Sequence, residues 1–378
     1  MKAIFLKIIA ALMIVPAWLT SRKDRRRQIV VLRCDEFGDF LLWLGAAAAL
    51  RQRYPAKEWR ITVIVRPFLA QMASLCPYFD NIEIVDTRIY PDNFYYRLRM
   101  LFHMRQLHAE LAINAVVDRN PTNDHLLRFI RAKRKIGFRP VNCQLETGRA
   151  EKLIETESYY NELVELPHNQ PIVYSFFKLI AAAGAFSPPS LDGLAFMGKL
   201  PRMFYDNYII VVPGAGFPRR CWSPSKFAEL LRYWPQPLPT IVFAGTAAES
   251  ELAAAIIAQL PATIHAINIC GQTALIELAA WVRHANLVVS NETGTAHLAT
   301  LLEVPTVVIL GCGHLNFFFP YPKEFHKIHC KTVLADCSQT GCCWQCHESD
   351  SSLPYPCIAE ISVDSVLAAV RELSGELD

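Results

Sequence analysis

The sequence predicts an α/β protein with two parallel sheets, and three observations support this fold class. Apolar runs rich in β-branched residues alternate with helical patterns along most of the chain, which is typical of βαβ units. At 378 residues the chain is too long for one hydrophobic core and suits two domains of ordinary size. With 52% hydrophobic residues, it has enough apolar material for two buried sheets. We therefore expect domains at residues 28–190 and 202–360, joined by a linker at 188–201.

Residues 286–311 form the clearest βαβ unit. They predict a strand, a polar turn, a helix and a second strand, at 287–289, 290–295, 296–302 and 306–310. The turn places Thr293, Gly294 and Thr295 at a helix N-terminus, where free N–H groups and the helix dipole favour a phosphate. An ordinary strand–helix turn with a threonine cap would use the same residues, so this segment by itself leaves both interpretations open.

The first predicted strand ends in a short loop before a helix at 39–53. Asp39 occupies the expected N-cap position of this helix, where capping would contribute about 1 kcal/mol. A carboxylate at this edge of the sheet, facing a cleft between the domains, can also act as a general base. Asp35 and Glu36 in the loop are the reserve candidates, and Gly38 is expected to supply the turn geometry.

The second domain is expected to begin with a strand at 208–212. The loop after this strand contains Pro213 and Gly214. Ser223 and Pro224 then form an N-cap and N1 pair, which opens the next helix.

Five segments, taken in order, resemble bacterial glycosyltransferase family 9, the ADP-heptose:lipopolysaccharide heptosyltransferases and their relatives. The matching features are a strand with a G-D turn, a P-G-A loop with a basic residue before x-W-x-P, a strand ending in F-x-G, a G-x-T turn and a D-T-G-x-x-H-L-A turn. They occur at residues 30–55, 211–231, 242–245, 271–273 and 292–299. The resemblance runs from about residue 28 to the C-terminus. It rests on the order and spacing of the motifs, since none is specific by itself.

The resemblance implies a GT-B fold, in which two Rossmann-like domains face each other across a cleft. It implies an inverting glycosyl transfer without a required metal ion, from a nucleotide-diphosphate sugar such as ADP-heptose bound by the second domain. The acceptor would be a hydroxyl of lipopolysaccharide core or of another cell-surface glycan. By family analogy, Asp39 is the catalytic base. The donor-binding residues would be Pro213, Gly214, Arg220, Glu292, Thr293, Gly294, Thr295 and His297.

Two positions depart from the family pattern. Arg220 stands where a lysine reaches the donor diphosphate, and arginine can hold the same oxygens with a different geometry. Its neighbour Arg219 could substitute for it. Glu292 stands where an aspartate is usual and moves the carboxylate about one methylene outward, which leaves the donor sugar open. His297 could contact phosphate or sugar, or it could be a core histidine.

Residues 1–27 combine an apolar run with a basic block. The run at 3–19 is shorter than the about 20 residues that a spanning helix needs. We expect an anchor in the membrane interface, on the cytoplasmic face of the inner membrane, with a single span or a packed tail as alternatives. Seven basic residues and one acidic residue give residues 2–27 a net charge of +6, within a chain total of +3. The remainder is therefore slightly acidic, which excludes a basic nucleic-acid binder.

Twelve cysteines are present, and six of them fall at residues 330–357. The pattern C-x4-C-C-x2-C, followed by one more cysteine, offers enough thiolates for a structural zinc ion or an iron–sulfur cluster. The candidate ligands are Cys337, Cys342, Cys343, Cys346 and Cys357. Because the pattern is not a clean pair of C-x2-C motifs, we expect a plain structural role for the cysteines, with a metal site as the alternative.

Two other functions fit the same predicted fold. One is a sugar-nucleotide epimerase or hydrolase, which would act without an acceptor. The other is a non-catalytic, membrane-associated binding protein, in which Arg220 and Glu292 reflect lost chemistry and the Cys-rich segment is a metal module.

Two helices are expected to make long-range contacts. The C-terminal helix, within residues 361–378, is expected to pack back across both domains. The aromatic and basic helix at 93–107 is expected to face the core with a solvated basic edge. A membrane or acceptor contact is the alternative for that helix.

Overall fold

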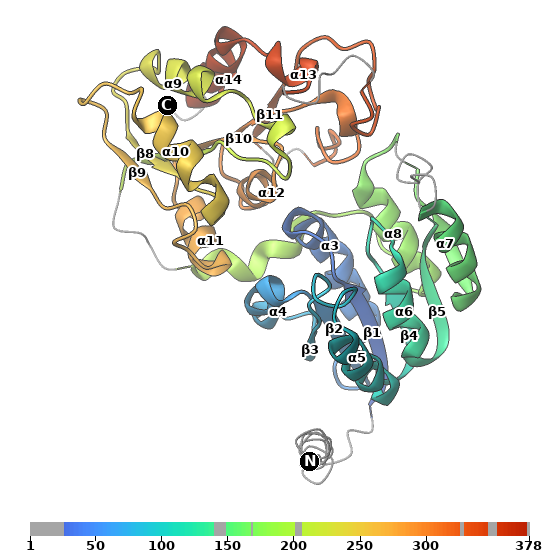
Figure 1. Ribbon diagram of the computed structural model, residues 1–378. Helices are drawn as coiled ribbons and strands as arrows, with labels where there is room; N and C mark the ends of the chain where they lie inside the picture. Colours follow the sequence, from blue (N-terminus) through green and yellow to red (C-terminus); the bar gives the residue numbers. More distant parts are fainter. Residues whose placement is uncertain are drawn as a thin grey trace, which may run out of the picture.

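The computed structural model describes residues 26–139, 149–167, 169–200, 206–325, 329–346 and 354–375. These residues form two parallel six-stranded sheets, which lie in two lobes of the molecule (Figure 1). The anchor predicted at residues 1–27 lies outside the described residues apart from its last two. Within the described ranges, no helix has the length and apolar character needed to cross a membrane.

The first sheet has the strand order β3-β2-β1-β4-β5-β6. Its strands are β1 Arg27–Arg33, β2 Trp59–Val65, β3 Asn81–Ile84, β4 His108–Asn114, β5 Arg131–Arg139 and β6 Glu162–Glu165. The helical segments of this lobe and of the connection that follows are α3 Phe37–Arg53, η1 Pro67–Leu69, α4 Ala70–Leu75, α5 Phe94–Gln106, α6 Pro121–Phe129, α7 Arg149–Thr156, η3 Glu157–Tyr159, α8 Ile172–Ala182 and η4 Asp192–Lys199. The central strand β1 is buried from Gln28 onward, as expected of a parallel strand covered by helices on both faces.

The second sheet has the strand order β12-β11-β10-β7-β8-β9. Its strands are β7 Tyr208–Val212, β8 Thr240–Phe243, β9 Ala266–Asn268, β10 Leu287–Asn291, β11 Thr306–Ile309 and β12 Cys330–Val333. Its helical segments are η5 Pro218–Arg220, α9 Pro224–Arg232, η6 Ala247–Glu249, α10 Ser250–Ile257, α11 Leu275–Arg283, α12 Gly294–Leu301, η7 Cys312–His314, α13 Pro356–Ala359 and α14 Val363–Gly375. The central strands β7 and β10 are buried along their whole length.

Both sheets follow the same topology, in which the strand order reverses once. The reversal lies between β1 and β4 in the first sheet and between β7 and β10 in the second. Ligands of open parallel sheets bind at such points, outside the carboxyl ends of the strands. The loops after β1, β7 and β10 therefore mark the candidate site.

Most predicted elements are present with small shifts at their ends. The helix opened by Ser223 and Pro224 begins as predicted, with the Ser223 side chain accepting from the Lys226 N–H. The strand predicted at 112–117 begins earlier, at His108. Within the predicted linker, η4 packs on α3.

The prediction that the C-terminal helix packs across both domains is wrong. Helix α14 contacts α9, β11 and β12 of the second lobe. Its apolar stripe, which includes Val366, Val370 and Leu373, belongs to a hydrophobic cluster formed by residues of the second lobe. Because that cluster covers the stripe, the helix has no apolar face left for the first lobe.

The prediction that α5 faces the core is confirmed for one side of the helix, where Tyr96 and Leu101 pack against the hydrophobic cluster that contains Met100 and Met104. Among its side chains, Met100 and Met104 are buried. Phe94, Tyr95 and Phe102 are 59%, 83% and 63% exposed. The helix therefore presents an aromatic surface to the outside of the first lobe.

Candidate active site

Helix α3 begins two residues earlier than predicted. Phe37 is its first residue and Glu36 its N-cap, so Asp39 lies in the first helical turn. The Glu36 side chain does not cap the helix; it is 71% exposed and pairs with Arg66. The capping role predicted for Asp39 is therefore wrong, and the position of this carboxylate needs another explanation.

Asp35 and Asp39 lie around the buried guanidinium of Arg33. Arg33 Nη1 is 2.8 Å from Asp35 Oδ2, and the guanidinium donates to the carbonyls of Ala115 and Asp39. Burial and the Asp35 carboxylate raise the pKa of Asp39 to about 8. Burial also raises the pKa of Asp35 to about 6, although Arg33 opposes this rise. The Oδ1 atoms of both carboxyl groups are shielded from solvent and have no hydrogen-bond partner among the described residues. The pair can therefore exchange a proton near neutral pH, as a general base must.

The N-termini of α3 and α12 touch each other, one from each lobe (Figure 1). A Cβ added to Gly38 would lie 2.8 Å from His297 Cδ2 and 3.4 Å from Gly294 Cα. A Cβ added to Gly294 would lie 3.0 Å from the backbone nitrogen of Gly38. Glycine is thus needed here for close approach, whereas the sequence predicted a turn role for Gly38. The contact brings the Asp39 turn next to the Thr293 turn.

His297 is a buried histidine with its own partners. Its Nδ1 lies 2.6 Å from the Tyr321 hydroxyl oxygen, and its ring stacks on Phe319 with centroids 4.3 Å apart. Burial lowers the pKa of His297 to about 3, which keeps the ring neutral. These contacts favour the core-histidine interpretation over contact with a phosphate.

The helix N-terminus predicted at residues 293–295 is present. Thr293 is the N-cap of α12; its Oγ1 accepts from the Ala296 N–H at 3.2 Å and lies 2.9 Å from Ser290 Oγ. The first N–H groups of the helix, those of Gly294 and Thr295, have no partner within the helix. Because α12 begins at the carboxyl end of β10, this helix end can bind an anion at the switch point.

Arg220 and Glu292 are coupled electrostatically at the same edge of the second sheet. The Arg220 guanidinium carbon lies 4.2 Å from the centre of the Trp344 ring and 5.2 Å from that of Phe217. Burial lowers the pKa of Arg220, whereas Glu292 opposes this. The Glu292 side chain is 8% exposed, and burial raises its pKa to about 7 against the effect of Arg220. Arg220 Nε and Glu292 Oε2 have no hydrogen-bond partner in the part of the chain that the structure describes, so both can serve a ligand.

Asn291 holds the loop that contains Pro213 and Gly214. Its Nδ2 donates to the carbonyls of Pro213 at 2.7 Å and Gly214 at 3.1 Å, and its Oδ1 accepts from the Trp222 N–H at 3.1 Å. A Cβ added to Gly214 would lie 1.9 Å from Glu249 Oε1, so this loop also runs close to the one after β8. Sequence reasoning missed Asn291, although its place directly before the E-T-G turn was a usable signal.

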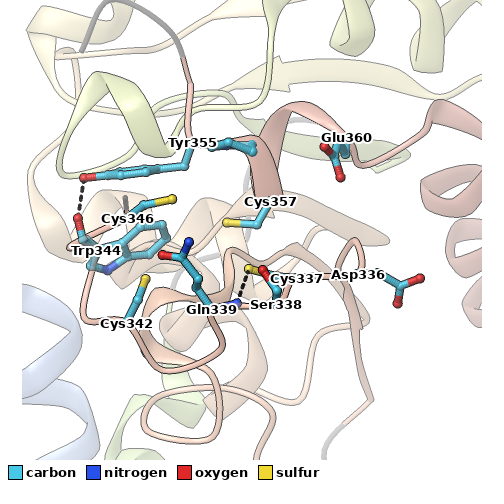
Figure 2. Close-up of a pocket in the computed structure, with 11 residues that line it drawn as sticks. Asp336, Cys337, Ser338, Gln339, Cys342, Trp344, Cys346, Tyr355, Cys357 and Glu360 are labelled. Atoms are coloured by element: carbon cyan, nitrogen blue, oxygen red, sulfur yellow. Dashed lines mark hydrogen bonds between the residues drawn. The ribbon is translucent and has the colours of Figure 1, made fainter. Parts of the chain in front are cut away.

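The Cys-rich segment lies next to the Arg220 end of the site, because Trp344 belongs to it. Four of the five predicted ligands line one cavity of about 120 Å³ (Figure 2): Cys337, Cys342, Cys346 and Cys357. The inclusion of Cys343 is wrong, since its sulfur is disulfide-bonded and its side chain does not line the cavity. Cys312, which sequence reasoning did not consider, joins Cys337 and Cys357.

Two parallel α/β lobes that meet at helix N-termini beside their switch points define a protein of the GT-B class. Residues 158–346, half of the chain, match the sequence profile of Glycosyltransferase family 9 (heptosyltransferase). The chain belongs to this family.

Relatives of known sequence and structure agree with this assignment. Lipooligosaccharide heptosyltransferase 2 of Campylobacter jejuni is 25% identical over 165 residues, which are 43% of this chain and 50% of that protein; the match spans about half the length of that relative. Lipopolysaccharide heptosyltransferase 1 of Pseudomonas aeruginosa is 26% identical over 336 residues, which are 86% of this chain and 90% of that protein. The crystal structure of the glycosyl transferase family 9 from Veillonella parvula has a TM-score of 0.72 at 18% identity, covering 93% of this chain and 98% of that one. This structural likeness shows the fold.

Proposed function

We propose that the chain is a glycosyltransferase that moves a sugar from a nucleotide-diphosphate donor to a hydroxyl acceptor, with inversion at the anomeric carbon. The observation that supports this most is the contact between Gly38 and Gly294. It brings the helix turn that carries Asp39, whose carboxyl group has a raised pKa, next to a helix N-terminus suited to a diphosphate. Such a pairing suits a reaction that removes a proton on one side and releases an anion on the other.

In the proposed reaction, the acceptor oxygen attacks the anomeric carbon while the bond from that carbon to the diphosphate oxygen breaks. The carboxylate of Asp39 takes the acceptor proton, and the diphosphate leaves with the electron pair. The N–H groups of Gly294 and Thr295 and the guanidinium of Arg220 stabilise the charge that develops on the leaving group. Arg33 keeps Asp35 ionised at lower pH than Asp39, because it pairs directly with Asp35.

The proposed donor is ADP-heptose or a related nucleotide sugar, and the proposed acceptor is a lipopolysaccharide-core or other lipid-linked glycan. The supporting fact is that the relatives from Campylobacter jejuni and Pseudomonas aeruginosa are named heptosyltransferases. Glu292 replaces an aspartate of the family pattern, so a panel of nucleotide sugars is the direct test of the donor.

The proposed location is the cytoplasmic face of the inner membrane, where a lipid-linked acceptor is available. The exposed aromatic side chains of α5 support a membrane contact, since Phe94 and Phe102 are more than half exposed and arginines lie on the same helix. The basic block within residues 2–27 adds attraction to anionic lipid.

The first test is binding of a panel of nucleotides and nucleotide sugars to the purified chain, measured by thermal shift. Selective stabilisation by ADP or an ADP-sugar is expected. A preference for another nucleotide would show that the donor carries that nucleotide in place of ADP. No stabilisation of a folded chain by any of them would favour the non-catalytic alternative. Sugar released or isomerised from a bound donor without an acceptor would favour the epimerase or hydrolase alternative.

A further inference from the structure

Three cysteines from separate segments bring their sulfur atoms together behind the proposed donor site. Cys312 follows β11, Cys337 lies in the loop after β12, and Cys357 is in α13. Their sulfur atoms lie within 4.8 Å of one another, and all three are free thiols. In a tetrahedral site with Zn–S bonds of about 2.3 Å, the sulfur atoms are about 3.8 Å apart. The three thiols therefore need little movement to bind one metal ion.

The cavity beside these thiols offers a fourth ligand. Cys342 and Cys346 line it together with Cys337 and Cys357, and Figure 2 shows their side chains around a common space. Five thiols are thus available for a site that needs four. Soft thiolate ligands of this kind select zinc or iron over magnesium or calcium.

Backbone N–H groups point at two of the sulfur atoms. The Cys312 N–H donates to Cys357 Sγ at 3.4 Å, and the Gln339 N–H donates to Cys337 Sγ at 3.4 Å. Donors of this type stabilise the negative charge of metal-bound thiolates. This observation is independent of the spacing of the sulfur atoms and indicates the same ligand.

We propose that Cys312, Cys337 and Cys357 bind one metal ion of the zinc or ferrous type, with a fourth thiolate from Cys342 or Cys346. On binding, each ligand loses its thiol proton, so four protons are released and the site carries two negative charges. A site closed by four protein thiolates has no open position for a substrate and is structural. It would fix the loop at residues 334–346, in which the structure has no helix or strand.

The loop that the metal fixes also carries a side chain of the donor site. Trp344 lies between Cys342 and Cys346 in sequence, and its Nε1 donates to His314 Nδ1 at 3.1 Å. A Cβ added to Gly313 would lie 2.5 Å from its ring, so the indole is packed directly on the chain after β11. The same ring contacts Arg220, whose guanidinium carbon lies 4.2 Å from the ring centre. The metal therefore acts as a positioning element for Arg220, a consequence that rests on the proposed function.

The test begins with elemental analysis of the full chain purified under reducing conditions without chelator. About one metal ion per chain is expected, and the element found tells whether the site holds zinc or iron. Cys312→Ser, Cys337→Ser and Cys357→Ser should each lose the metal. Cys330→Ser is the matched control, since Cys330 lies in the same Cys-rich segment but does not line the cavity, and it should keep the metal. Single changes at Cys342 and Cys346 identify the fourth ligand.

A second measurement on the unmodified chain covers the case in which the serine variants fail to fold. Cobalt(II) added to the metal-free chain should give the charge-transfer absorption of thiolate coordination, and zinc should abolish it. Thiol labelling should then increase when a chelator is added. The proposal is overturned if the folded chain binds neither zinc nor iron(II) nor cobalt(II). It is equally overturned if two of the three thiols are joined as a disulfide in the natively purified chain.

The link to Arg220 has its own readout. Chelation should weaken ADP binding while the chain stays folded, and zinc or iron should restore it. If the metal is present but its removal leaves ADP binding unchanged, the structural site stands and the positioning role fails. If ADP does not bind in either state, the proposed donor is wrong, whereas the metal content is unaffected.

Discussion

The two helices that meet at Gly38 and Gly294 begin alike but are surrounded by different charges. Each follows a central strand of its sheet at the switch point. Around the first turn of α3 lie Asp35, Glu36 and Asp39, whereas α12 begins with glycine and threonine after one glutamate. In the proposed reaction, the helix end in one lobe carries the proton acceptor and the helix end in the other lobe binds the anion. The choice is made by three or four side chains and not by the fold.

Two arginines, one near each helix end, also differ in how the protein binds them. Arg33 is fully buried and donates to the carbonyls of Ala115 and Asp39 while it pairs with Asp35. Arg220 is half-buried, and its Nε lacks a hydrogen-bond partner within the described residues. Arg33 thus binds protein groups through both of its terminal nitrogens, whereas the Arg220 guanidinium lies against the Trp344 ring and can serve a ligand.

Replacing the proposed base should give the largest effect. Asp39→Asn keeps the shape of the side chain and removes its ability to take a proton, so kcat/KM for transfer should fall about 10²–10⁴-fold. The Kd for ADP should stay within a few-fold, as measured by calorimetry. In the unmodified chain the rate should rise with pH through about 8, because the proposed base is active when Asp39 is deprotonated and burial raises the pKa of Asp39 to that value.

Glu36→Gln is the matched control for this change. Glu36 is in the same loop but is exposed and paired with Arg66, so its loss should leave most of the transfer rate. A larger loss of rate in Glu36→Gln than in Asp39→Asn would indicate that Glu36, and not Asp39, is the general base.

The second-largest effect should come from Arg220. Arg220→Ala removes a charged donor from the proposed diphosphate site, and the Kd for ADP should rise about 10–100-fold. Arg219→Ala is the control, because the Arg219 guanidinium lies 4.2 Å from the Tyr355 ring centre, outside the proposed phosphate contact. Equal losses of ADP affinity in the two variants would show that local charge, and not the position of Arg220, holds the nucleotide.

The contact between the two helix ends can be broken with a single methyl group. In Gly38→Ala the new Cβ would lie 2.8 Å from His297 Cδ2, and overpacking of this kind costs about 1–3 kcal/mol. We expect a Tm lower by a few degrees and a loss of transfer, measured by calorimetry and by rate. Gly216→Ala is the control, since a Cβ there meets nothing within 4 Å. An unchanged rate in Gly38→Ala would separate the contact from catalysis.

Local features of the site could be predicted from the sequence, because each depends on neighbouring residues. The turn at 293–295 follows a buried apolar run and precedes a helical pattern, and the structure has α12 beginning there. The end of helix α3 at Arg53 was equally accessible. Its start was not, since Glu36 caps without a side-chain hydrogen bond and so leaves no recognisable N-cap residue.

Features that depend on contacts between distant segments could not be predicted. Arg33 is a charged residue at the end of a strand, and its burial comes from the packing of α3 and α8, whose Trp43 and Phe176 rings have their centres 5.9 and 4.7 Å from its guanidinium carbon. Cys312 is a single cysteine in sequence and joins Cys337 and Cys357 through the pairing of β11 with β12. The core-facing side of α5 could be predicted from its pattern, but the exposure of Phe94, Tyr95 and Phe102 could not, because an apolar pattern does not say which of its residues another element covers.

The smallest expected effect concerns the carboxyl group of the anion site. Burial raises the pKa of Glu292 to about 7, so it is neutral below that pH and negative above it. A negative Glu292 beside the proposed diphosphate site repels the ligand, and ADP affinity should fall by roughly threefold to tenfold between pH 6 and 8. The ADP phosphate ionises in the same pH range, so the pH dependence that comes from ADP itself must be measured separately.

Glu292→Gln is the control for this purpose, because the amide stays neutral at every pH. Calorimetry at pH 6, 7 and 8 should show that the glutamine variant binds ADP as the unmodified chain does at pH 6 and more tightly at pH 8. If the two curves run parallel, Glu292 does not sense the diphosphate, and the charge contrast between the two helix ends is weaker than their sequences indicate.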